Sequence, residues 1–209
     1  MPKLAPKTQA VRREHILDAA ERCFISKGFH PATMDDICRE AGISPGALYT
    51  HFASKEELIA GLCERETDRF SKELAKIAEA ADLLAALRSM AEKYCCQEPI
   101  GKVRLHVEIG AEAGRNAVIA NTVRGADKAI SGSLVHLLER ERDEGRIQPT
   151  VPIEIAVRAM SALGDGLFLH RTLDPHFDPT SIIPAMMTMI GALLAPAPDL
   201  REKTGEHNS

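Results

Sequence analysis

Two hydroxyls, an imidazole and an ammonium group lie within a short stretch near the start of this 209-residue chain, at Tyr49, Thr50, His51 and Lys55. Groups of these kinds donate hydrogen bonds to phosphate oxygens, and the ammonium adds electrostatic attraction. Gly46, just ahead of them, has no side chain, so the backbone there can approach a base edge or a phosphate closely. The combination indicates a surface that contacts the backbone and bases of a nucleic acid.

Two short helices would have to present these side chains. Thr33 can cap the first helix, Asp36 can return the hydrogen bond three residues later, and Gly42 suits the left-handed position that ends the helix. Ser44 can cap the second helix, and Pro45 fits its first position, where a missing N–H does no harm. Helix, glycine-containing turn and helix form the helix-turn-helix, whose second helix enters the major groove of DNA.

The second helix is predicted to span residues 45–51. Leu48 and Phe52 stand four residues apart and should both face inward, so the other side chains of this helix face outward. A third helix should open at Ser54. Lys55 then places a cation in a first turn, where the helix dipole disfavours it unless a phosphate binds there. The residues assigned to phosphates are Thr33, Tyr49, His51 and Lys55, those assigned to base edges are Pro45, Gly46, Ala47 and Thr50, and Ser44 joins them at the turn.

This stretch resembles the DNA-binding signature of the tetracycline-repressor (TetR) family, from residue 11 to about residue 60. The residues that carry the resemblance are Ile16, Ala19, Ala20, Phe24, Gly28, Thr33, Ile37, the run 41–44, Leu48, Tyr49, His51, Phe52 and the run 54–58. The resemblance implies an all-α homodimer of about nine helices, in which a three-helix head binds operator DNA and a helical body binds a small-molecule effector. It also implies a repressor that the effector releases from a near-palindromic operator. From the residues alone, an ordinary helical hairpin remains the alternative.

Charge is uneven along the chain, although its formal sum is −4 at pH 7. Residues 1–55 carry +2 and the remainder carries −6, so a slightly basic head can still form a local DNA-binding patch. Residues 1–10 are interpreted as a short basic arm or a disordered terminus. Five cysteines without regular spacing and the lack of an apolar N-terminal segment favour a cytoplasmic protein with reduced thiols.

Three regions are predicted from these patterns. The head spans residues 1–55, the effector-binding and dimerisation body spans residues 56–195, and a disordered tail spans residues 196–209. A long helix from Ser54 to about Ala80 would be the only rigid connection between head and body. Further helices are expected from residue 83 until Pro99 and Gly101 end the helix, and then over 102–114, 117–144, 152–173 and 181–195.

The last predicted helix, residues 181–195, is apolar nearly all round and carries no charge. A membrane span is excluded because the run is shorter than the ~18–20 apolar residues required and Pro184 interrupts it. A helix that is apolar on two faces fits a core on one side and a second subunit on the other. The residues assigned to the dimer interface are Met160, Leu167, Ile183, Met186, Met187, Ile190 and Leu194.

Mixed apolar and polar side chains on the body helices suit a small-molecule cavity, although packing of a core explains each residue equally well. The residues assigned to the effector are Met90, Tyr94, His106, Phe168 and His170. No enzyme motif or metal-ligand spacing occurs, so we expect no enzymatic activity, no metal and no cofactor. The expected partners are double-stranded operator DNA, a second copy of the chain and an unknown small-molecule effector, with no membrane.

Two other classes of function stay open. One is a helical small-molecule-binding protein whose helix-turn-helix is degenerate and binds no DNA. The other is a helical enzyme, for which the chain offers no matched acid–base or nucleophile set. The adjacent pair Cys95 and Cys96 could sense oxidants, although buried inert thiols are the commoner case.

Overall fold

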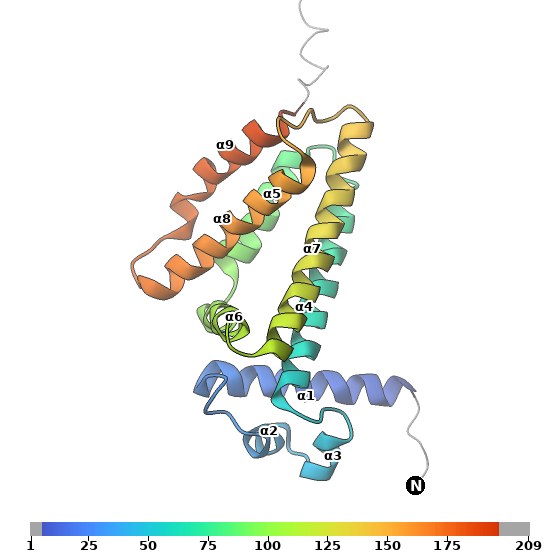
Figure 1. The fold of residues 1–209 in the computed structure, drawn as a ribbon, viewed down its shortest axis with the longest axis vertical. Coiled ribbons are helices and arrows are strands. Elements are labelled where there is room, and N and C mark those ends of the chain that lie inside the picture. Colours follow the sequence, from blue (N-terminus) through green and yellow to red (C-terminus); the bar gives the residue numbers. More distant parts are fainter. Residues whose placement is uncertain (1–5, 197–209) are drawn as a thin grey trace, which may run out of the picture.

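The computed structural model describes residues 6–196, which form nine α-helices and, within that range, no strand (Figure 1). The helices are α1 (Pro6–Lys27), α2 (Met34–Ala41), α3 (Pro45–Tyr49), α4 (Lys55–Ile77), α5 (Leu83–Ala91), α6 (Ile100–Ala113), α7 (Ala117–Asp143), α8 (Ile153–Leu173) and α9 (Ile183–Leu194), with a π-helix η1 (Glu92–Gln97) and a 3₁₀-helix η2 (Pro179–Ser181). The all-α prediction is confirmed. The predicted tail beyond residue 196 and the first five residues of the predicted arm lie outside the described residues.

The head forms one end of the molecule, where α1 lies across the base of α4 with α2 and α3 on its far side (Figure 1). Leu17 of α1, Ile37 of α2 and Leu48 of α3 are each fully buried in one shared core. Leu58, in the first turn of α4, is buried in the same core. The head is therefore closed by the first turns of α4 as well as by the three helices before it.

The body surrounds a second core. α4 and α7 run side by side, and α5, α8 and α9 lie beyond them at the other end of the molecule (Figure 1). Leu74 of α4, Leu138 of α7 and Met186 of α9 are buried together there. Two body residues, Leu105 of α6 and Ile119 of α7, are instead buried in the core of the head. The prediction that α4 alone connects head and body is therefore wrong, because α6 and α7 also reach the head.

Several helix boundaries differ from the predicted ones. α1 begins at Pro6, so half of the predicted arm is helical. The helix that starts at Leu83 changes to π-helical geometry at Glu92 before it ends. Gly101 was predicted to end a helix but lies in the first turn of α6, where an added Cβ would stand 2.6 Å from Cγ2 of Ile25. The missing side chain thus permits a close contact between α6 and α1.

The apolar character of α9 does not make it a membrane helix. α9 is 12 residues long, and no helix in the described part of the chain is long and apolar enough to cross a membrane.

Candidate DNA-binding site

Local hydrogen bonds fix the first helix of the helix-turn-helix as the sequence predicts. The side chain of Thr33 accepts a hydrogen bond from the backbone N–H of Asp36 at 3.1 Å, and the Asp36 carboxylate accepts one from the N–H of Thr33 at 3.1 Å. The Lys27 ammonium, 2.6 Å from Asp36, and the Thr33 hydroxyl hold the pKa of that carboxyl well below its usual range. Gly42 ends the helix in the left-handed conformation, with φ of 63°.

The second helix, α3, presents a small and polar exposed surface. Ser44 caps α3 by accepting a hydrogen bond from the N–H of Ala47 at 3.3 Å, and Leu48 fixes the helix by its complete burial. α3 ends at Tyr49 instead of His51 because Thr50 takes the C-cap position. The residues of α3 and its C-cap that point away from the core form what we call the reading face, and all four are exposed: Pro45, Gly46, Tyr49 and Thr50.

The remaining predicted DNA contacts differ in exposure. Thr33 and Ser44 are exposed, whereas Ala47, His51 and Lys55 are half-buried. The hydroxyl of Thr50 donates a hydrogen bond to the carbonyl of Gly46 at 2.8 Å, as threonines in helices often do. Its methyl group therefore remains the part of Thr50 that is free to meet a base.

Lys55 has partners inside the protein. Its ammonium donates hydrogen bonds to the carbonyls of Phe29 at 2.8 Å and His30 at 3.0 Å, and it lies 4.6 Å from the centre of the Phe29 ring. These contacts offset the unfavourable position of the cation at the helix N-terminus. An ammonium has three N–H donors, so one remains for a phosphate.

The same α1–α2 loop is held from the body. The Glu108 carboxylate of α6 accepts a hydrogen bond from the N–H of Phe29 at 2.9 Å, and Glu112 lies 2.9 Å from Nε2 of His30. Hydrogen bonds from Arg115 and then His30 lower the pKa of Glu112, so this nearly buried carboxyl stays ionised. The position of Lys55 thus depends on α6 as well as on the head.

A hollow of about 200 Å³ lies between α1 and α3, and no sequence pattern indicated it. Its polar lining consists of Arg12, His15, Ser44 and His51, and no acidic residue lines it. Nε2 of His15 lies 2.8 Å from the carbonyl of Ala41, so this histidine also ties α1 to the end of α2. Arg12 was not among the predicted DNA contacts, because it lies outside the helix-turn-helix. Its positive charge was the one sequence feature that could have indicated it.

The predicted effector residues do not meet at one place. His106 and Phe168 make an edge contact with ring centres 5.0 Å apart, and Asp165 lies 3.7 Å from the same histidine. Tyr94 packs separately against Phe70, with ring centres 5.5 Å apart, and its buried hydroxyl has no partner among the described residues.

The other two effector residues lie elsewhere in the body. His170 stacks on Phe177, with ring centres 5.5 Å apart, and Met90 packs against the second core. Burial raises the pKa of the Cys95 and Cys96 thiols, that of Cys95 to about 11, which disfavours the thiolate form that reacts with oxidants.

The packing of α8 and α9 bears on the predicted dimer interface. Five of the seven residues assigned to it are at most 5% exposed because they pack in the core of their own chain: Leu167, Ile183, Met186, Ile190 and Leu194. Met160 and Met187 are half-buried against the same core. Helical periodicity finds apolar positions but does not say which face the chain's own core covers, so the interface assigned to these residues stays a prediction.

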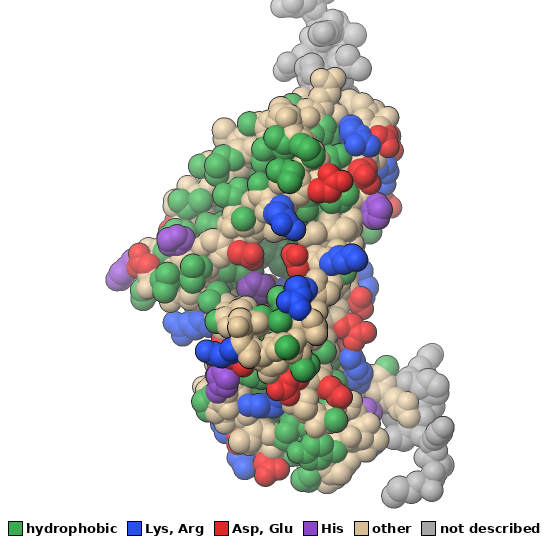
Figure 2. Space-filling model, viewed as in Figure 1, with side chains coloured by type: hydrophobic (Ala, Val, Ile, Leu, Met, Phe, Trp, Pro, Cys, Tyr) green, Lys and Arg blue, Asp and Glu red, His purple; other side chains and the backbone are tan. Residues whose placement is uncertain are grey.

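Other large apolar side chains are exposed on these two helices. We call them the apolar face: Ile155, Leu169 and Leu173 of α8, with Ile182 just before α9 and Met189 within it. Their exposed fractions run from 38% to 68%. Figure 2 shows hydrophobic side chains gathered over α8 and α9, a concentration that on a soluble protein marks an interaction surface.

Comparisons with known proteins establish the family. Residues 16–62 match the model described as "Bacterial regulatory proteins, tetR family", and residues 83–195 match "BetI-type transcriptional repressor, C-terminal". The chain belongs to the TetR family, as its sequence signature predicted, and is a DNA-binding transcriptional regulator.

Individual relatives agree with this assignment. "HTH-type transcriptional regulator UidR" of Escherichia coli strain K12 is 30% identical over 184 residues, which cover 87% of this chain and 92% of the relative. "HTH-type transcriptional repressor Rv1474c" of Mycobacterium tuberculosis is 25% identical over 167 residues, covering 80% and 86%. The solved structure of Salmonella enterica GusR superposes with a TM-score of 0.79 at 30% identity, covering 93% of this chain and 100% of GusR.

Proposed function

We propose that the chain is a homodimeric repressor whose two heads bind the two halves of a near-palindromic operator and which a small-molecule effector releases. The observation that carries the DNA-binding part is α3, which capping and the burial of Leu48 fix in place while its reading face stays exposed. Helices presented in this way enter the major groove, and a two-fold dimer reads two half-sites.

The proposed DNA contacts fall into two kinds. Tyr49 stands exposed on α3, where its hydroxyl can donate to a phosphate. Thr33 is exposed at the start of α2, but its hydroxyl donates to the Asp36 carboxylate at 2.9 Å, so a phosphate contact there would replace this bond. Gly46 and the methyl of Thr50 would lie against base edges. Arg12 joins the phosphate contacts, because it lines the basic hollow beside His51.

The dimer is proposed to form through the apolar face. A second copy of the chain brings an identical face, and a two-fold axis pairs the two isologously. An apolar side chain of this size contributes about 1.5–3 kcal/mol when it goes from full exposure to full burial, and these five are 38% to 68% exposed, so each can contribute about half of that on dimerisation.

The effector part rests on the family, in which ligand-responsive regulation is typical. An effector acts by binding one conformation of the dimer better than the DNA-bound one. His106, Asp165 and Phe168 form a group of an imidazole, a carboxylate that accepts hydrogen bonds and an aromatic ring, which a ligand can contact between α6 and α8. We infer a regulator and not an enzyme, since the site offers DNA contacts and no reacting group.

Selection from random duplexes tests the proposal. The purified protein should enrich one near-palindromic sequence, and a mobility shift with that duplex should give a complex containing two subunits. Failure to enrich any sequence would favour the alternative of a degenerate helix-turn-helix. A thermal-shift screen of small molecules would then identify the effector, because a ligand that prefers the native state raises Tm.

A further inference from the structure

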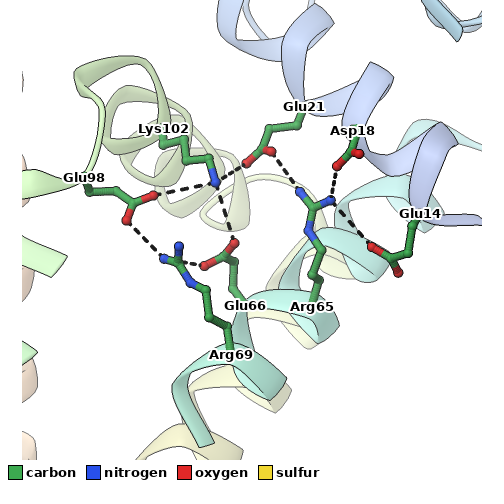
Figure 3. A network of polar contacts seen from close by, with 8 residues as sticks. All are labelled: Glu14, Asp18, Glu21, Arg65, Glu66, Arg69, Glu98 and Lys102. Carbon is green, nitrogen blue, oxygen red and sulfur yellow. Dashed lines mark hydrogen bonds and ion pairs between the residues drawn. The ribbon is translucent and has the colours of Figure 1, made fainter. Parts of the chain in front are cut away.

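Eight charged side chains meet where α1, α4 and the N-terminal end of α6 converge (Figure 3). We call them the junction network: Glu14, Asp18 and Glu21 of α1, Arg65, Glu66 and Arg69 of α4, Glu98 just before α6, and Lys102 within it. α1 belongs to the DNA-binding head, whereas Glu98 and Lys102 belong to the body. The network therefore spans the boundary between the two.

Arg65 gathers the carboxylates of α1. Its guanidinium lies 2.7 Å from Asp18 and 2.8 Å from Glu21, and Glu14 is 3.7 Å away. Figure 3 shows the three carboxylates converging on this one side chain. Arginine suits the position because its planar fork can serve several carboxylates at once.

Lys102 joins α6 to α1. Its ammonium lies 3.2 Å from Glu21, 3.6 Å from Glu98 and 4.0 Å from Glu66, so it stands between carboxylates of all three segments (Figure 3). The neighbouring residue, Gly101, is the one whose missing side chain lets α6 meet Ile25 of α1. A close packing contact and an ion pair thus fix the same two helices at the same point.

The network continues into the body. Glu98 lies 3.1 Å from Arg69 of α4, and its backbone carbonyl accepts a hydrogen bond from Arg171 of α8 at 2.8 Å. Arg171 also donates to the carbonyl of Cys95, at 3.0 Å, within η1. A continuous chain of hydrogen bonds and ion pairs therefore runs from Arg171 of α8 to α1 in the head.

The junction network contains fewer cations than carboxylates. Five carboxylates share three cations, so each cation bridges at least two acids. Loss of one acid leaves its cation another partner. Loss of Lys102 removes the ion pairs that join α6 to α1 and α4, although Glu21, Glu66 and Glu98 each keep one arginine partner. Loss of Arg65 leaves Glu14 and Asp18 without a partner in the network.

We propose that the junction network sets the angle between head and body, and that Lys102 and Arg65 are positioning residues for operator recognition. This inference rests on the proposed dimeric binding of two half-sites. Each base pair inserted between half-sites moves one by about 3.4 Å and rotates it by about 34–36° about the helix axis. Heads held at a fixed angle fit one spacing, whereas loosened heads tolerate several.

The experiment compares binding of selected operator with duplexes that carry one or two extra central base pairs. Lys102→Gln should reduce the preference for the selected spacing by about two- to tenfold, the range that loss of one partly exposed ion pair in each subunit allows. Lys102→Arg, which keeps the charge, should preserve the preference. Arg65→Gln provides a second and independent loss of a cation.

Lys93→Gln is the matched control. Lys93 pairs with Glu73 at 3.0 Å, so the variant removes the same kind of ion pair, but one that joins η1 to α4 within the body. It should leave the spacing preference unchanged, because this pair does not reach the head. Circular dichroism melts confirm that each variant is folded.

Two results would overturn the inference in distinguishable ways. If the wild-type protein prefers one spacing and both Lys102→Gln and Arg65→Gln keep that preference in full, the network does not position the heads. If the wild-type protein binds its selected duplex with no spacing preference, or binds none, the proposed dimeric function fails first and the inference with it.

Discussion

The reading face of α3 and the apolar face of α8 and α9 are both exposed, and they differ in the residue types that form them. The reading face of α3 is small and polar, and the hydrogen bonds that present it come from residues within a few positions, such as Ser44 and Thr33. The apolar face of α8 and α9 carries large aliphatic side chains, and it is exposed only because the opposite side of each helix fills the body core.

This difference decides what residue type can reveal. A polar side chain beside a helix cap is costly to bury without a partner, so it lies at the surface and its residue type indicates its role. Met189 and Ile190 are neighbours of nearly equal polarity, yet one is 45% exposed and the other 4%. For apolar docking surfaces, residue type therefore does not separate interface from core, and only the packing does.

The largest effect is expected from substitutions within the apolar face. Leu169→Arg or Met189→Arg should give folded monomers, because both side chains are exposed in the subunit and an unpaired charge buried at the interface costs about 3–5 kcal/mol. The dissociation constant of the dimer should rise by roughly 100-fold or more. Sedimentation velocity at micromolar concentration measures the mass.

The buried neighbour supplies the contrast. Ile190→Arg should unfold the subunit and not merely separate two subunits, because Ile190 lies in the body core. Circular dichroism distinguishes the two outcomes. A Leu169→Arg protein that stays dimeric would exclude the apolar face as the interface.

On the polar surface, Lys55→Ala should weaken binding to all duplexes alike. Removal of one phosphate contact in each subunit should lower the salt slope of binding by about two for the dimer. A salt titration of the mobility shift checks this, with Lys76→Ala, at the far end of α4, as the control. An unchanged slope with a lower Tm would mean that the ammonium serves only the carbonyls of Phe29 and His30.

Substitutions at two glycines distinguish a residue that stabilises the helix-turn-helix from a residue that lies against DNA. Gly42→Ala should cost about 1–2 kcal/mol of stability, because φ is 63° there, although no atom lies within 4 Å of the added methyl. Gly46→Ala should instead raise stability by about 0.5–1 kcal/mol and weaken operator binding, since its methyl would stand between α3 and DNA. Thermal melts and mobility shifts on the same samples give both signs. Unaltered binding by Gly46→Ala would show that the backbone does not approach DNA there.

The smallest effect is expected at Thr50. Its hydroxyl is bonded to the carbonyl of Gly46, so Thr50→Ser keeps that bond and removes only the methyl. Discrimination at one position in each half-site should fall by less than about 1 kcal/mol, with no change in salt slope, because Thr50 is uncharged. Binding to single-base variants of the operator measures this, and an equal loss for every variant would place Thr50 away from the bases.

The head was predictable from the sequence to the level of single hydrogen bonds. Thr33, Asp36, Gly42 and Ser44 act within their own helix ends, so spacing alone shows their partners. The contacts of Lys55 were not predictable, because its carbonyl partners lie 25 and 26 positions earlier in the chain. The phosphate-binding role inferred for Lys55 from the helix dipole therefore left out the two carbonyls that bind its ammonium.

The body followed a different pattern. Helical periodicity predicted the helices of the body closely, apart from the change to π-helix at Glu92, for which the sequence gives no signal. Site residues depend on which helices meet, and this is why His106 and Phe168 come together while Tyr94 does not join them. Gly101 shows the same limit, since a glycine that breaks one helix and a glycine that admits a close neighbour look identical in sequence.

The way in which α3 is held has a consequence for how such a regulator diverges. Leu48 is the one residue of α3 that is fully buried, and the four residues of the reading face contribute nothing to the core. After duplication of the gene, substitutions at Pro45, Tyr49 or Thr50 can change the preferred operator at little cost in stability, so descendants can acquire new target genes by single steps. Substitution of Leu48 would instead destabilise the head, because its buried side chain holds α3 against the core.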